Sequence, residues 1–166
     1  MRLAGPAVTL ALLIASLPAE AAPPPIAAAE QAAIFKAAGF TRKGTKWHSE
    51  CGLEDNAPSA TPGAIEDYRD INGDGRPDAV VTEGGSFCYG NSGTGYWLLS
   101  KQASGAWKLM DSNTGILDLQ KTKGVGGWPD IQVGGPGFCF PVLRWNGTAY
   151  KLNRHQYEGR PCKPAF

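Results

Sequence analysis

The sequence predicts a mainly β protein: a compact antiparallel sheet or sandwich, or two blade-like units, with one short N-terminal helix and two disulfides. Three observations predict this class. Short segments rich in β-branched and aromatic residues alternate with turn residues from residue 64 to residue 154. Only one segment, 26–38, has the Ala-rich composition of a helix. The chain also contains four cysteines, an even number that fits two disulfides.

The expected elements follow in order along the chain. Residues 26–38 are rich in helix formers and end before Gly39, a usual C-terminal cap. Residues 40–51 predict a short hairpin, and residues 64–69 lead into an acidic loop. Asn146-Gly147 is a type I′ hairpin signal. The segments expected to be strands are 78–83, 96–101, 106–111, 116–121, 129–133, 139–145 and 149–154.

The first residues have the pattern of an export signal. Arg2 precedes an apolar run, residues 3–17, and the small residues Ala19 and Ala21 form a cleavage site. The run is too short to span a bilayer comfortably, so no membrane anchor is expected. We therefore expect residues 1–21 to be a signal peptide and residues 22–166 to be a single domain, periplasmic or secreted.

The cysteines of an exported chain meet an oxidising compartment, where they pair. Cys51, Cys88, Cys139 and Cys162 allow three pairings, and the sequence leaves the choice open. Moderate loop lengths favour Cys51–Cys88 with Cys139–Cys162. The alternative is a set of free, buried thiols.

The chain is nearly neutral once the signal peptide is removed. Without Arg2 and Glu20 the totals of 16 basic and 15 acidic residues become 15 and 14. This balance indicates neither nucleic acid nor an anionic membrane as a partner. Residues 66–78, however, hold five acids against two arginines, and such a cluster repels itself unless a cation lies among it.

The acidic loop runs from Asp70 to Asp78 and reads DINGDGRPD. Oxygen side chains fall at Asp70, Asn72, Asp74 and Asp78, and the carbonyl of Arg76 could add one more oxygen. Ca²⁺ takes six to eight oxygen ligands, and alternate residues of a tight loop can supply several of them. We therefore expect residues 22–166 to be a calcium-binding domain, with an Asx-rich turn that binds no metal as the alternative.

This loop leaves the EF-hand pattern after nine positions, because Val81 stands where the bidentate Glu is required and a strand follows. It resembles the calcium loop of FG-GAP and VCBS-type repeats, D-x-[DN]-x-D-G-x-x-D leading into a strand. The resemblance implies that the same acidic positions hold the ion, as in the blades of those β-propellers. It also implies an adhesion or surface-interaction module.

Part of the sequence recurs after about 52 residues. Pro77-Asp78 with the following Val-Val, Gly-Gly and Phe-Cys parallels Pro129-Asp130 and its continuation. Each copy ends in a similar strand, WKLMD at 107–111 or YKLNR at 150–154. Repeats of this period are typical of propeller blades, but two units cannot close a propeller. We expect two blade-like units, of which only the first kept its metal loop; chance recurrence is the alternative.

Catalytic groups are sparse. His48 and His155 are the only two histidines, and neither stands in a metal or nucleophile motif. The cysteines are expected to be oxidised, so no thiolate nucleophile remains. The sequence therefore predicts a non-enzymatic protein that acts by binding.

One stretch suggests what it binds. Residues 90–96 read GNSGTGY, and Ser92 to Tyr96 match S-G-x-x-Y. The stretch resembles bacterial periplasmic inhibitors of c-type and i-type lysozymes, which insert this motif into the active-site cleft of the enzyme. The resemblance implies Ser92, Gly93 and Tyr96 as partner-binding residues and a muramidase as the partner. The alternative is a flexible hairpin loop with Tyr96 opening the next strand.

The aromatic residues leave a third function open. Five Trp, five Tyr and six Phe could include an exposed platform for a glycan, as in a carbohydrate-binding module. Trp97, Trp107 and Trp145 fall inside strand patterns and are expected to be structural. Trp128 is the one expected to be exposed.

Overall fold

The computed structural model describes residue 1 and residues 25–54, 57 and 59–164 of the 166-residue chain. The predicted signal peptide, residues 1–21, lies outside these residues except for Met1. Within them no helix is long and apolar enough to cross a membrane. The elements are α1 (Ala28–Ala37), β1 (Thr41–Lys43), β2 (Lys46–His48), η1 (Cys51–Leu53), β3 (Ala64–Arg69), β4 (Asp78–Gly84), α2 (Ser86–Tyr89), η2 (Gly90–Ser92), β5 (Thr94–Lys101), β6 (Trp107–Thr114), β7 (Ile116–Lys123), η3 (Val125–Gly127), β8 (Pro129–Gly134), β9 (Phe140–Trp145), β10 (Tyr150–Tyr157) and β11 (Arg160–Pro161).

The strands form two antiparallel meanders, which confirms the mainly β, sandwich-like class. The first unit is the sheet β3-β4-β5-β6, and the second unit is β7-β8-β9-β10 with the short β11 at its edge. The sequence repeat coincides with these units, because Pro77-Asp78 leads into the second strand of the first unit and Pro129-Asp130 starts the second strand of the second unit. The hairpin β1-β2 is separate.

The two units pack against each other through their apolar faces. Val80 of β4 and Leu98 of β5 meet Ile131 of β8 and Trp145 of β9 in one cluster. Trp128 belongs to this cluster and is buried, so the expectation that it is exposed is wrong. The buried members of the cluster are Ile71, Val80, Tyr96, Leu98, Trp128, Ile131, Val133, Trp145 and Tyr150.

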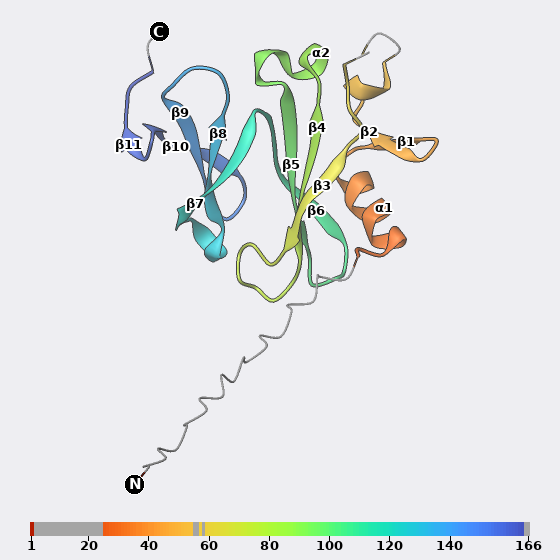
Figure 1. Ribbon diagram of the computed structural model, residues 1–166, viewed down its shortest axis with the longest axis horizontal. Coiled ribbons are helices and arrows are strands. Elements are labelled where there is room, and N and C mark those ends of the chain that lie inside the picture. The colour runs from red at the N-terminus through yellow and green to blue at the C-terminus, as the bar shows by residue number, and fades with distance from the viewer. Residues whose placement is uncertain (2–24, 55–56, 58, 165–166) are drawn as a thin grey trace.

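The other face of the first unit is covered by α1 and the β1-β2 hairpin (Figure 1). Ala79 and Val81 alternate with Val80 along β4 and therefore point to this side, where they contact Ile34 and Phe35. Phe35 also stacks on Trp47, with ring centroids 5.3 Å apart. This second cluster gives the Ala-rich helix the apolar surface it needs, since a ten-residue helix is marginal by itself.

The other face of the second unit is polar, and within the described chain it carries no covering helix. In its place, side chains on this face form a hydrogen-bonded network. They are Gln120, Thr122, Asp130, Gln132, Arg144, Arg154 and Gln156. A polar outer face is what the last unit of a stacked array requires.

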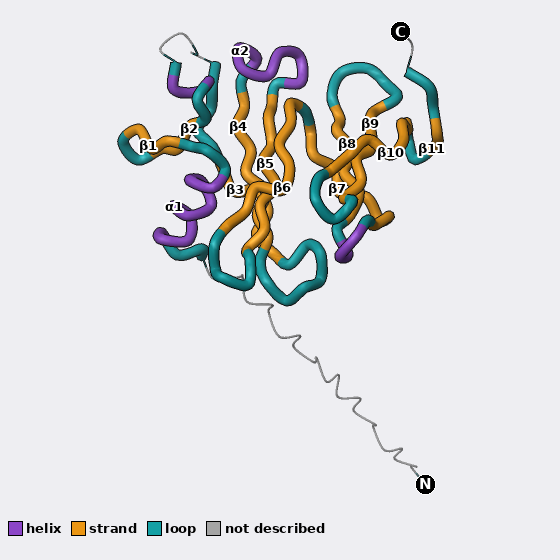
Figure 2. The backbone as a smooth tube through the Cα atoms, turned by 180° about the vertical axis from the view of Figure 1, so that it is seen from behind, coloured by secondary structure: helices purple, strands orange, loops and turns teal. Residues whose placement is uncertain are grey.

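The disulfides are Cys51–Cys88 and Cys139–Cys162, which confirms the favoured pairing. Their Cα atoms are 5.9 and 5.6 Å apart, inside the usual range. Cys88 and Cys139 are repeat-equivalent, and both follow the second strand of their unit. The two connections lie at the same end of the molecule (Figures 1 and 2), and we call this the disulfide end.

Candidate calcium loop and partner surface

The loop 70–78 joins β3 to β4 at the end of the molecule opposite the disulfide end (Figure 1). Gly73 and Gly75 have φ values of +86° and +83°, a conformation that favours glycine. The carboxylate of Asp70 accepts the backbone N–H groups of Gly73, Asp74 and Gly75 at 2.7, 3.1 and 2.8 Å. These hydrogen bonds, that of Gly75 most strongly, lower the pKa of Asp70. Asp70 therefore organises a tight turn as an anion.

The middle of the loop is held by Asn72 and Asp74. Asn72 Oδ1 accepts the N–H of Asp74 at 3.0 Å, and Asp74 Oδ1 accepts the N–H of Arg76 at 2.9 Å. The guanidinium of Arg76 also pairs with Asp74 Oδ2 at 2.5 Å and donates to the carbonyl of Lys101. The side-chain oxygens of Asn72 and Asp74 therefore accept hydrogen bonds from N–H groups of the loop itself.

Asp78 differs from the other loop acids because it is completely buried, with 0 % exposure. Its Oδ2 accepts the N–H of Ile71 at 2.9 Å. Its Oδ1 has no hydrogen-bond partner among the described residues. Burial raises the pKa of Asp78, against the hydrogen bonds that the Ile71 N–H, the Ser100 side chain and the Asn72 backbone provide. A buried carboxylate oxygen without a partner is costly, so this atom calls for a donor or a cation.

Asp130, the repeat equivalent of Asp78, is equally buried but fully paired. Arg144 donates to both of its oxygens, at 2.8 and 2.9 Å, and Arg154 donates to Oδ2 at 2.6 Å. Thr122, at the position equivalent to Asp70, donates to Oδ2 as well. Two guanidinium groups therefore balance the buried carboxylate of the second unit, whereas that of the first unit forms no ion pair with any residue that the structure describes.

The donor set of the loop fits Ca²⁺ in chemistry, since it consists of Asp70, Asn72, Asp74 and Asp78 with the Arg76 carbonyl. Across residues 25–54, 57 and 59–164, no three His, Cys, Asp or Glu side chains converge as an assembled metal centre. The orphaned Oδ1 of Asp78 is the structural feature that fits an ion in the loop.

The residues of the S-G-x-x-Y motif differ in their exposure. Tyr96 is 1 % exposed, because alternation along β5 places it on the same face as Leu98, in the core between the units. Its hydroxyl donates to Asp111 at 2.6 Å. The expectation that Tyr96 enters a partner's cleft is therefore wrong. Ser92 is half-buried in η2, and Gly93 is exposed beside it.

The disulfide end presents a pair of exposed aromatics that the motif did not indicate. Phe87 and Phe138 immediately precede Cys88 and Cys139, and they are 53 % and 78 % exposed. The connections that carry them touch, since a Cβ placed on Gly135 would lie 3.1 Å from Ser92 Oγ. The recurrence of Phe-Cys in both repeats is the sequence signal that could have located this surface.

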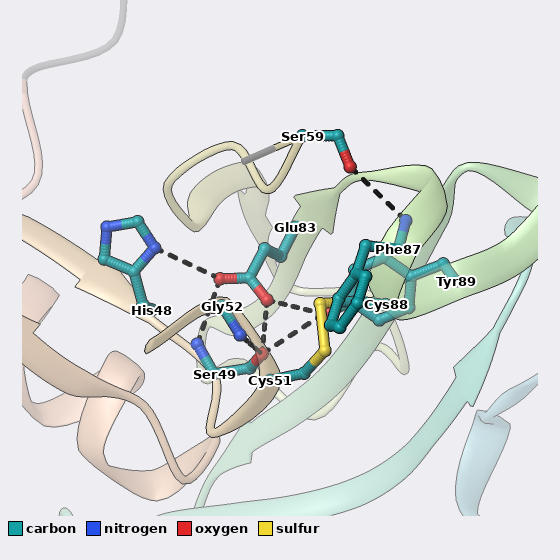
Figure 3. Close-up of a disulfide and its surroundings, with 9 residues drawn as sticks. All are labelled: His48, Ser49, Cys51, Gly52, Ser59, Glu83, Phe87, Cys88 and Tyr89. Carbon is teal, nitrogen blue, oxygen red and sulfur yellow. Dashed lines mark hydrogen bonds and ion pairs between the residues drawn. A yellow bond between two sulfur atoms is a disulfide. The ribbon is translucent and has the colours of Figure 1, made fainter. Parts of the chain in front are cut away.

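A buried polar network beside Cys51–Cys88 was also not predicted from the sequence (Figure 3). Glu83 of β4 is 1 % exposed and accepts the N–H and the hydroxyl of Ser49 and, at 2.5 Å, the hydroxyl of Tyr89. His48 Nδ1 is buried and lies 3.5 Å from the Glu83 carboxylate. The network anchors the start of the segment 49–63 to the first unit. The Ser49 hydroxyl contacts the Glu83 carboxylate and the Tyr89 hydroxyl.

Comparison with known proteins adds no family. No protein-family model matches the chain, and no curated protein or solved structure is significantly similar to it.

Proposed function

We propose that the protein is an exported, non-enzymatic binding protein, and that Ca²⁺ in the loop 70–78 stabilises its first unit. The main support for a metal ion is the contrast between two repeat-equivalent acids. Asp130 is balanced by Arg144 and Arg154, while the buried Asp78 Oδ1 has no hydrogen-bond partner in the described part of the chain. A divalent cation would supply to the first unit the charge that two arginines supply to the second.

The metal proposal is tested by thermal unfolding in millimolar Ca²⁺ and in EDTA. Loops of this kind bind at ~10⁻⁴–10⁻³ M outside cells. At ten times the dissociation constant, binding adds about 1.4 kcal/mol, a rise in Tm on the order of 4 °C. Asp74→Ala should abolish that rise. Asp67→Asn removes an acid just outside the loop and should keep it. Equal Tm values for the unchanged protein in both buffers would refute the metal.

The binding surface we propose is the disulfide end. Phe87 and Phe138 expose apolar rings there, next to Ser92 and Gly93, and a disulfide restrains each connection. Exposed aromatics on restrained connections suit a protein partner. The partner class we propose is a cell-wall lytic enzyme of the lysozyme type, which works with two carboxylates in an open cleft.

This part of the proposal is tested with muramidase assays across c-type, g-type and i-type enzymes. If the protein inhibits one class, Phe138→Ala and Phe87→Ala should each raise the inhibition constant by about tenfold or more, as central aromatic contacts do. Tyr96→Phe is the matched control, because it removes a buried hydroxyl and should leave inhibition unchanged. The absence of inhibition in all three classes would discard the lytic enzyme and leave the calcium proposal intact.

A further inference from the structure

Three cations of the second unit line one cavity that includes no residue of the loop 70–78 or of the disulfide end. Lys123 at the end of β7, Arg144 of β9 and Lys151 of β10 line a cavity of about 450 Å³. No acidic residue lines it. The volume is in the range of small-molecule sites and exceeds what a single inorganic anion fills.

The charge around this cavity is not balanced by the described residues. Lys151 stands directly opposite Arg144 in the β9-β10 register, where like charges repel. Asp130 is shared between Arg144 and Arg154, and within the described chain neither Lys123 nor Lys151 forms an ion pair. The asymmetry extends to the whole unit: residues 116–164 hold seven Lys and Arg against three Asp and Glu, whereas residues 64–115 hold four against seven. An anion would relieve the repulsion.

The central cation is held in a fixed orientation. Arg144 donates from Nε and Nη2 to the two oxygens of Asp130, so its plane is set by a bidentate pair. Among the described residues, Nη1 of Arg144, a residue that lines the cavity, has no hydrogen-bond partner. Asp130 is thus a positioning residue, and the site is ordered before a ligand arrives.

The remaining lining residues indicate what kind of anion fits. The β10 strand bulges at Asn153, where pairing shifts between Leu152 and Arg154, and this brings the Asn153 amide to the cavity. Asn146 uses its Oδ1 within its own turn, which leaves its NH₂ group to donate outward. The exposed side chains of Val125 and Leu152 add an apolar wall.

We propose that this cavity binds an acidic sugar, that is, a pyranose bearing a carboxylate or a phosphate. The cations take the acid group, the two amides take hydroxyls, and the apolar wall takes the face of the ring. A nucleobase would need an exposed ring to stack on. Trp145, the aromatic of the cavity, is buried against Tyr150 with 6 % exposure.

Isothermal titration of the mature protein in calcium-free buffer tests this inference, since oligouronates themselves bind Ca²⁺. Trigalacturonate tests for a carboxylate sugar, with the uncharged maltotriose as its counterpart. Glucose 6-phosphate tests for a phosphate sugar, with inorganic phosphate as its counterpart. At least one acidic sugar should bind ten times more tightly than its counterpart, and Lys123→Met and Lys151→Met should each weaken that binding fivefold or more. Lys36→Met, on the exposed side of α1, removes the same charge and should have no effect.

Three results would overturn the inference. The first is that neither acidic sugar binds more tightly than its counterpart. The second is that Lys36→Met weakens binding as much as Lys151→Met, which would indicate general charge attraction. The third is that a twelve-nucleotide single-stranded DNA binds more tightly than both sugars, which would make the ligand a nucleic acid. None of them bears on the metal loop.

Discussion

Asp130 is a buried carboxylate stabilised by hydrogen bonds from three side chains. Burial by itself raises the pKa of Asp130, but the donors Arg144, Thr122 and Arg154 outweigh burial and hold the pKa well below its ordinary value. Removing one partner of such a group leaves charges unpaired. At the scale of single residues, this network is the main polar determinant of the second unit.

We therefore predict that Asp130→Asn lowers the free energy of unfolding by about 2–4 kcal/mol, the lower end reflecting the partly exposed guanidinium groups. Urea denaturation at pH 7 measures the change. Asp118→Asn, an exposed acid in β7, should change stability by less than ~0.5 kcal/mol. Equal losses for the two variants would show that the network contributes little.

The same residue predicts a dependence on pH. Because the pKa of Asp130 is lower in the folded protein than the ordinary 3.8, its contribution is fully present above that value. The contribution is lost as the pH falls from about 4 toward the native pKa, where the folded state must take up the proton. The protein should thus lose more stability than Asp130→Asn between pH 5 and pH 2.5. If urea titrations show that the unchanged protein and Asp130→Asn lose the same unfolding free energy over this pH range, Asp130 is not the source of the pH dependence.

Residue-level reasoning from the sequence succeeded where the signal was local. Asp70, Asn72 and Asp74 lie in one tight turn held by their own hydrogen bonds to the backbone. It failed for Tyr96 and Trp128, whose burial depends on which face of a strand or loop meets the other unit. The buried Glu83 could not be located either, because its partners Ser49 and Tyr89 are 34 and 6 residues away along the chain.

At the scale of elements, periodic strands were predictable and short irregular elements were not. The helix was expected at 26–38 and spans 28–37. The one-turn α2 and the two-residue β11 are too short to have a period. Asn146-Gly147 does form a hairpin turn, but only Gly147 of the pair has a positive φ, so the turn is not type I′. The Asn146 side chain binds the N–H groups of the turn instead.

The helix α1 offers a direct test of how the first unit is covered. Phe35 is buried between Trp47 and Phe40, with ring centroids 5.3 and 5.7 Å away. Phe35→Ala should cost about 3–5 kcal/mol of unfolding free energy, because it empties the centre of that cluster. Lys36→Ala, one position along the same helix, should cost under ~0.5 kcal/mol. Guanidinium denaturation distinguishes the two, and similar midpoints would mean that α1 is not packed there.

At the scale of the molecule, the two units share a strand order but differ in what covers them. The first unit is enclosed by α1 on one side and by the second unit on the other. The second unit ends in a polar, basic face. The repeat in the sequence predicted two units, whereas the stacking order could not be predicted, because it depends on contacts between strands far apart in the chain.

The loop 70–78 also touches the second unit. A Cβ on Gly127 of η3 would overlap the carbonyl oxygen of Asn72, so the loop 70–78 packs tightly against its repeat equivalent, residues 122–130. Both loops lie at the end of the molecule opposite the disulfide end (Figure 2). An ion in the loop 70–78 should therefore change the NMR signals of that loop. The signals of residues 122–130 serve as an internal reference in the same molecule.

The most direct test of the central claim is a calcium titration followed by amide NMR. We predict that the amides of Gly73, Gly75 and Ile71 shift with a saturating, one-site curve at a dissociation constant of ~10⁻⁴–10⁻³ M. The amides of Thr122 and Asp130 should move little, and Mg²⁺ should not reproduce the curve, since it dehydrates reluctantly. Asp78→Asn should abolish the saturating shifts. Unchanged loop amides in 10 mM Ca²⁺, or equal shifts in both loops, would contradict a calcium site at residues 70–78.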